Sequence, residues 1–211
     1  MKCPHCLHLF HPQFSRISIG VGPEGILNAQ HQTCPGCGQS IVYLEFRDRY
    51  DNINLDFLSF PRGVARTPIP PEVTDTKLIN DYREASLVLK DSPKASAALS
   101  RRSLQHILRE KGGVKNGDLS NEIQEVLDSN KLPSDIAQNL DAIRNIGNFA
   151  AHPTKSTSTG EIVDVEPEEA EWNLEVLEQL MDFYYVKPAL AKKKRDELNA
   201  KLASTGKPPI K

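Results

Sequence analysis

Four cysteines stand in two close pairs near the start of the 211-residue chain. Cys3 and Cys6 belong to the segment CPHC, and Cys34 and Cys37 belong to CPGC. A two-residue gap lets both sulfurs of one turn face the same ion, and two such turns complete a tetrahedral shell of four thiolates. The sequence therefore predicts one Zn²⁺ ion bound by these four cysteines. Exposed redox pairs are the alternative, but neither pair has the helix start that usually accompanies them.

A shell of four thiolates has no open coordination position, so we expect the zinc to be structural and not hydrolytic. It would stabilise a segment that is too small to hold itself together. Nearby histidines are not expected to be ligands, because the thiolates fill the shell; these are His5, His8, His11 and His31.

A second group of polar residues lies in the segment 144–153, RNIGNFAAHP. At about 100° per residue, one edge of a helix there would hold Arg144, Asn145, Asn148 and His152. A helix C-terminus favours a protonated imidazole. A guanidinium beside such a proton donor suits a phosphodiester, so Arg144 and His152, with Asn148, are the candidate catalytic residues.

The same polar residues have a structural interpretation. The glycine among them would permit close helix packing, the asparagines would bond to a neighbouring loop, and His152 would cap the last carbonyls. Both interpretations stay open on the sequence alone.

The elements that position these groups change in type along the chain. Strands are expected at 16–19 and 41–46, with a glycine-rich turn region between them. Helical periodicity begins near residue 74, and further helices are expected to start after Ser92, Asp118, Pro133, Glu166 and Lys187. Gly112 and Gly113 should end the second helix. The fold class is therefore mainly α, with a small β zinc ribbon before an all-α helical bundle.

Composition agrees with this division into a zinc ribbon at 1–60, a proline-rich linker at 61–73, a helical bundle at 74–186 and a basic helical tail at 187–211. Residues 73–186 carry twelve basic and twenty acidic side chains, whereas residues 187–211 carry eight basic and two acidic ones. A broad nucleic-acid surface on the bundle is therefore not expected, although the tail suits contact with phosphates. The chain has neither a membrane-spanning apolar run nor a leader pattern, so we expect a cytoplasmic protein.

From about residue 82 to 188 the chain resembles domain-of-unknown-function family 4145. The resemblance is carried by Arg101 and Arg102 in the second helix, by Arg144, Gly147, Asn148 and His152, and by Tyr184, Tyr185 and Pro188. That family is similar to the HEPN group of helical bundles, in which many members are metal-independent ribonucleases or toxins that act as dimers. The resemblance also implies an association with bacterial defence modules, in which some relatives carry an N-terminal zinc ribbon.

Two functions compete. The first is a recognition or adaptor module, nucleic-acid-associated or defence-related, which catalyses nothing itself. The second is a metal-independent ribonuclease that uses Arg144 and His152. Seven residues separate these two, a longer interval than HEPN ribonucleases have, and this favours the adaptor. Candidate partners are RNA or DNA, a partner defence protein, and a second copy bound through the helical bundle.

Overall fold

The computed structural model describes residues 1–62, 66, 68–151, 154–155 and 162–210, and the side chains of these residues outside 145–163. The chain divides into two compact units. The N-terminal unit contains Met1–Thr67 with Ser86–Asp91, and the helical unit contains Pro68–Ala85 with Ser92–Lys211. No helix within the described residues is both long and apolar enough to cross a bilayer. The finer boundaries expected from composition stay predictions.

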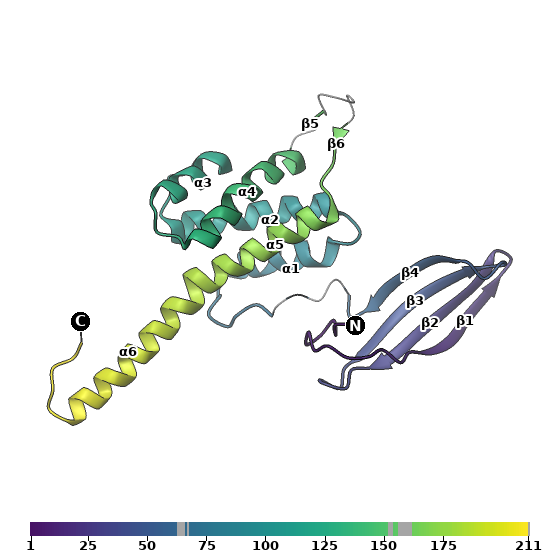
Figure 1. Ribbon diagram of the computed structural model, residues 1–211, viewed down its shortest axis with the longest axis horizontal. Coiled ribbons are helices and arrows are strands. Elements are labelled where there is room, and N and C mark those ends of the chain that lie inside the picture. Colours follow the sequence, from purple (N-terminus) through teal and green to yellow (C-terminus); the bar gives the residue numbers. More distant parts are fainter. Residues whose placement is uncertain (63–65, 67, 152–153, 156–161, 211) are drawn as a thin grey trace. The chain divides into compact units, whose positions relative to one another are not determined.

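The N-terminal unit is built on a four-stranded antiparallel sheet with the strand order β1-β2-β3-β4 (Figure 1). The strands are β1 (Ser15–Gly22), β2 (Gly25–Thr33), β3 (Ser40–Asp48) and β4 (Ile53–Phe60). The sequence predicted a strand within β1 and another within β3, but it missed β2 and β4. The predicted turn region was also too wide, because Gly20 and Gly22 belong to β1. Glycine weakens a strand without excluding it, and pairing along the whole length of β2 overrides that preference.

One face of this sheet is apolar near the cysteines and polar further along the strands. Near the cysteines, Ile41 is fully buried with Cys3 and Cys34, and a ring of aromatic and aliphatic side chains covers them: Phe10, Phe14, Tyr43 and Leu58. Phe14 meets Tyr43 edge to face, with ring centroids 5.5 Å apart. These side chains form the small apolar core on which the cysteine turns rest.

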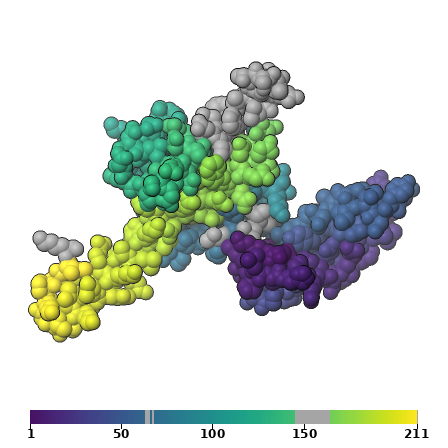
Figure 2. All heavy atoms as spheres, in the orientation of Figure 1, coloured from purple at the N-terminus to yellow at the C-terminus, as the bar shows by residue number. Residues whose placement is uncertain are grey.

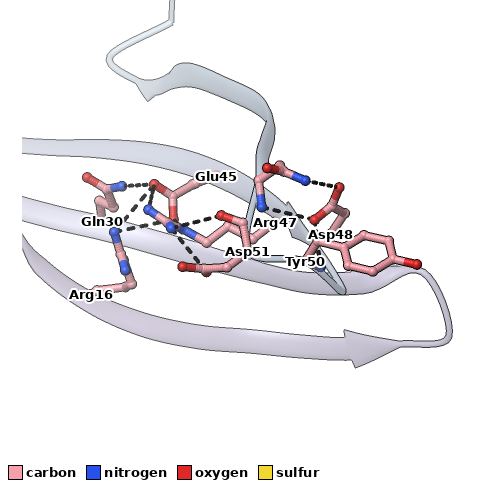
Figure 3. A network of polar contacts seen from close by, with 8 residues as sticks. Arg16, Gln30, Glu45, Arg47, Asp48, Tyr50 and Asp51 are labelled. Atoms are coloured by element: carbon pink, nitrogen blue, oxygen red, sulfur yellow. Dashed lines mark hydrogen bonds and ion pairs between the residues drawn. The ribbon is translucent and has the colours of Figure 1, made fainter.

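Further along the same face, the side chains are polar and centre on Glu45 (Figure 3). Its carboxylate is only 2% exposed. It accepts a 2.6 Å hydrogen bond from Arg47 Nε and another of 2.6 Å from Gln30 Nε2, and Arg16 Nη2 lies 3.4 Å away. A buried carboxylate is tolerated only with such partners, so this network replaces an apolar core here.

The helical unit begins with α1 (Thr76–Val88) and α2 (Pro93–Ile107), and α2 continues into the π-helical turn η1 (Leu108–Gly112). Next come α3 (Leu119–Asp128), α4 (Ser134–Ala151) and the short strands β5 (Thr154–Lys155) and β6 (Ile162–Val163). The chain then forms α5 (Pro167–Met181), the π-helical turn η2 (Asp182–Val186) and α6 (Lys187–Ser204). These last three follow one another without a break (Figure 1).

Local signals set most of these helix ends. The Ser92 side chain accepts a hydrogen bond from Ala95 N ahead of Pro93, and Asp118 accepts one from Asn121 N. Gly113 ends η1 with a left-handed φ of 73°. The helix starts expected at Ser92 and Asp118, and the end expected at the glycine pair, are therefore confirmed.

The core of the helical unit comes from buried side chains of the helices that precede α6. Leu78, Tyr82 and Ala85 of α1 are buried, as are Leu174 and Leu177 of α5.

Two buried carboxylates are each neutralised by an arginine of a neighbouring segment. Arg102 binds Asp81, with Nε 2.6 Å from Oδ2, and Arg109 binds Glu122 with Nε 2.8 Å from Oε1. The first pair links α2 to α1, and the second links η1 to α3.

The last helix differs from the others because none of its residues is buried. Figure 2 shows α6 as an arm, yellow-green to yellow, that extends from the rest of the helical unit. Most of its side chains are exposed among the described residues, and Asn199 and Leu202 are half-buried.

Candidate metal centre

The four cysteines lie in two turns with the same backbone hydrogen bonds. In the first turn, Cys3 N donates to His8 O (2.9 Å) and Leu7 N donates to Cys3 O (3.0 Å). In the second, Cys34 N donates to Gln39 O (2.9 Å) and Gly38 N donates to Cys34 O (2.9 Å). The two turns therefore present their sulfurs in equivalent ways.

The sulfur atoms come together as the sequence predicted. All four Sγ atoms lie within 4.8 Å of one another. Cys3 Sγ is 3.9 Å from Cys37 Sγ, and Cys6 Sγ is 3.9 Å from Cys34 Sγ. A tetrahedron with Zn–S bonds of about 2.3 Å has sulfurs about 3.8 Å apart. The cluster can therefore hold one metal ion, and its dimensions fit zinc.

Backbone amides of the turns point at the sulfurs. His5 N lies 3.3 Å from Cys3 Sγ, and Gly36 N lies 3.4 Å from Cys34 Sγ. Burial raises the pKa of Cys34, but the amides of Cys37 and Gly36 and the adjacent thiols outweigh it and lower this pKa to about 7. For Cys3, burial dominates and raises the pKa of the thiol. A bound cation would favour the thiolate form of every ligand.

The neighbouring histidines have other contacts. His5 Nε2 lies 2.8 Å from Ser40 O, which anchors the first turn to the start of β3. His8 packs against the second turn, where a Cβ at Gly36 would lie 3.1 Å from its ring. Glycine at position 36 therefore allows the two turns to approach closely.

The second predicted group is described only in part. Arg144 lies on α4, where its Nη1 donates to Gln124 Oε1 at 2.7 Å and its Nη2 lies 2.7 Å from Asp141 Oδ1. The side chain of Asn148 and the whole of His152 lie outside the described residues. The structure therefore shows Arg144 engaged with α3 and α4, and the assignment of Arg144, Asn148 and His152 as catalytic stays a prediction.

The two arginines of α2 have different surroundings. Arg102 is committed to Asp81 of α1, as described above. Arg101 lines a water-sized hollow of about 10 Å³ together with Ser100, Ile143 and Asn173. Burial lowers the pKa of Arg101. Arg101 thus faces α4 and α5, whereas Arg102 faces α1.

The network of hydrogen bonds around Glu45 was not predicted from the sequence. A signal was present, because Arg16, Gln30, Glu45 and Arg47 all occupy one face once the strands are paired. That signal becomes visible only when β2 is recognised as a strand.

Comparison with known families identifies the helical unit. Residues 83–201, more than half of the chain, match the family model described as Domain of unknown function (DUF4145). The protein belongs to this family. Neither the curated proteins nor the solved structures contain a match to the chain.

Proposed function

We propose that the protein is a recognition module that joins a zinc ribbon to a HEPN-like helical interaction domain. Its role is that of an adaptor, nucleic-acid-associated or defence-related, and it catalyses no reaction of its own. The metal that we assign to the cysteine cluster is a single structural Zn²⁺ ion. Zinc would hold the two turns together at the base of a sheet whose own apolar core is small.

The four-thiolate cluster is the observation that carries this proposal. Four thiolates, whose sulfurs here lie within 4.8 Å of one another, would use every coordination position of a zinc ion, so no position would remain for water or a substrate. The ion would contribute folding energy and not Lewis-acid chemistry. That limit argues against zinc hydrolysis and is compatible with the recognition role that we propose for the N-terminal unit.

The state of Arg144 supports the same proposal for the helical unit. A ribonuclease would need this guanidinium to face a phosphate, but Asp141 and Gln124 already satisfy two of its nitrogens. A phosphate would have to displace Asp141, whose side chain is 53% exposed. Metal-independent RNA cleavage by Arg144 and His152 is therefore the alternative, and α6 is the better site for phosphate contacts.

The experiment that tests the proposal is RNA cleavage by the purified chain in the presence of EDTA, with wild type beside His152→Ala. Metal content and helix content are measured on the same samples. We expect intact RNA from both proteins. Cleavage by the wild type and not by His152→Ala would overturn the proposal and establish the ribonuclease.

A further inference from the structure

The sheet of the N-terminal unit has a second face, opposite the Glu45 network, and it is apolar. The strand register places Ile17, Leu44 and Phe57 in one row across the sheet, and Leu27, Phe46 and Leu55 in the adjacent row. We call these six side chains the apolar face. They alternate along each strand with the residues of the polar network, as a pleated strand requires.

No side chain of the apolar face is buried in the chain. Ile17 is 61% exposed, Leu55 49% and Phe57 41%, and the three on the central strands are half-buried by their neighbours. An antiparallel sheet commonly leaves its polar face in water and packs its apolar face. In this sheet the polar face has its own internal partners, so the apolar face is the one that needs a cover.

We propose that the apolar face binds the same face of a second copy of this chain, which gives a homodimer of two sheets packed face to face. Four strands about 4.8 Å apart and about 25 Å long present roughly 500 Å² as a flat rectangle. Two copies stacked over the whole sheet face therefore cover about 1,000 Å² before the relief of the side chains is added, which reaches the lower limit for a specific interface. The two apolar rows would form the centre of that interface, and Ser15, His31 and Asp48 would lie at its rim.

The chemistry of the face suits a copy of itself. A two-fold interface uses the same patch on both subunits, so the patch must be complementary to itself. The two rows contain no Asp, Glu, Lys or Arg among the positions that the register describes, so no like charges meet at the centre of the interface. Ala29 lies between Ile17 and Leu44 in the first row, and this small side chain leaves space for a larger one of the facing sheet.

The same composition argues against nucleic acid as the occupant, because a phosphate backbone would find no cation in the two rows; Arg62 and Lys90 lie only at their β4 edge, in a pocket with Phe57. The proposed surface also differs from the helical bundle, through which the sequence alone suggested a dimer. The interface assigned here leaves the helical unit, including α6, free for other partners.

Light scattering on the full chain tests the proposal, with Ile17→Lys as the disrupting variant. Val21→Lys is a matched control, because Val21 lies on the same edge strand, is 79% exposed and belongs to the opposite face. We expect wild type and Val21→Lys at twice the chain mass of 23.5 kDa, and Ile17→Lys at the chain mass. Because each copy contributes one lysine, Ile17→Lys would bury two lysines in the interface. This should raise the dissociation constant of the dimer at least about 100-fold.

Phe57→Lys on β4 is the second disrupting variant, and it decides the result if Ile17→Lys loses its metal. A wild-type protein that is monomeric at the highest soluble concentration overturns the proposal and leaves a different protein or a lipid surface as the occupant. A dimer that survives both substitutions but dissociates with Leu190→Lys on α6 also overturns it, because the interface would then lie on the helical unit.

Discussion

Leu7 and Gly38 occupy equivalent positions in the two cysteine turns, and both have a left-handed backbone. Each follows the first cysteine of its turn by four residues, and each donates its amide hydrogen to the carbonyl of that cysteine. The φ of Leu7 is 63° and that of Gly38 is 71°. A left-handed conformation costs an L-residue about 1–2 kcal/mol, whereas glycine adopts it freely. The first turn therefore carries backbone strain that the second turn avoids.

We predict that Gly38→Ala destabilises the metal-loaded N-terminal unit by about 1 kcal/mol. A Cβ at this position meets no atom within 4 Å, so the cost comes from the backbone alone. Leu7→Gly should change stability by less, because relief of strain offsets the loss of a half-buried side chain. Both free-energy changes can be measured by denaturant unfolding, with hydrogen exchange of the sheet amides as the probe. Equal losses from the two substitutions would show that relief of strain at Leu7 does not offset the loss of its side chain.

Each cysteine should be necessary for metal binding. We expect one Zn²⁺ per wild-type chain, and none bound tightly by Cys34→Ser, because three thiolates leave the shell incomplete. Loss of the ion should open the N-terminal unit and leave the helical unit folded, since the two units have separate cores. Elemental analysis by mass spectrometry gives the zinc content, and circular dichroism gives the helix content.

His5→Ala is the control for this experiment. His5 contacts Ser40 O through its ring, so its removal should leave the metal content at one ion per chain. A chain that loses zinc on His5→Ala but keeps it on Cys34→Ser would show that the ligand set is wrong.

The cysteine cluster and several helix ends were predictable because the signals are local. A Cys-x-x-Cys pair, a capping serine before proline, and paired glycines each act within a few residues. Cys3, Ser92 and Gly113 accordingly lie where the sequence indicated. The π-helical turns η1 and η2 carry no comparable signal, since the same residues suit an ordinary α-helix.

The sheet was harder to predict because its signals are not local. In β2, Leu27 and Ala29 alternate with Asn28 and Gln30, but the residues 31–33 are all polar. This alternation is too short to predict a strand before β1 and β3 are placed on either side. Glu45 would count as an exposed charge until Arg16 and Arg47 are brought to it by pairing. The apolar face likewise becomes visible only from the register, because its members are scattered over four strands.

Glu45→Ala should destabilise the N-terminal unit by about 2–3 kcal/mol at neutral pH, because Arg47 loses the hydrogen bonds of its Nε and Nη2 to a buried carboxylate and keeps only its more exposed contact with Asp51. Arg16→Ala should cost less than about 1 kcal/mol, since Arg16 is 49% exposed and its ion pair is screened by water. Hydrogen exchange of the β3 amides measures the opening free energy of this part of the sheet. A larger loss of opening free energy from Arg16→Ala than from Glu45→Ala would contradict the central role of the Glu45–Arg47 pair.

The same carboxylate should make the sheet sensitive to acid. The hydrogen bond from Arg47 lowers the pKa of Glu45 below its ordinary 4.5, and this effect exceeds the opposing effect of burial. A lowered folded-state pKa gives stability above pH about 4.5 that is lost as the pH falls through the folded value. The opening free energy of β3 should therefore fall more steeply from about pH 5 to pH 3 in wild type than in Glu45→Gln. Identical slopes would show that this carboxylate is not the titrating group.

Three lysines on α6 should carry most of any contact with nucleic acid. Lys187, Lys194 and Lys201 are seven residues apart, so they share one side of the exposed helix. Lys187 also pairs with Asp182 at 3.1 Å, but both side chains are more than 45% exposed. Little free energy is lost when a phosphate replaces Asp182 in such an exposed ion pair. We expect the triple change to Gln to weaken binding of single-stranded RNA and to reduce the salt slope by about 2.

Fluorescence anisotropy over a series of salt concentrations measures both quantities. The matched control changes three exposed lysines outside α6, Lys77, Lys90 and Lys131, to Gln. This control alters the net charge by the same amount, so a purely long-range effect would weaken binding equally in both triple variants. Specific contact predicts a loss only for the α6 variant, because counterions are released where lysines meet phosphates and not where they remain in water.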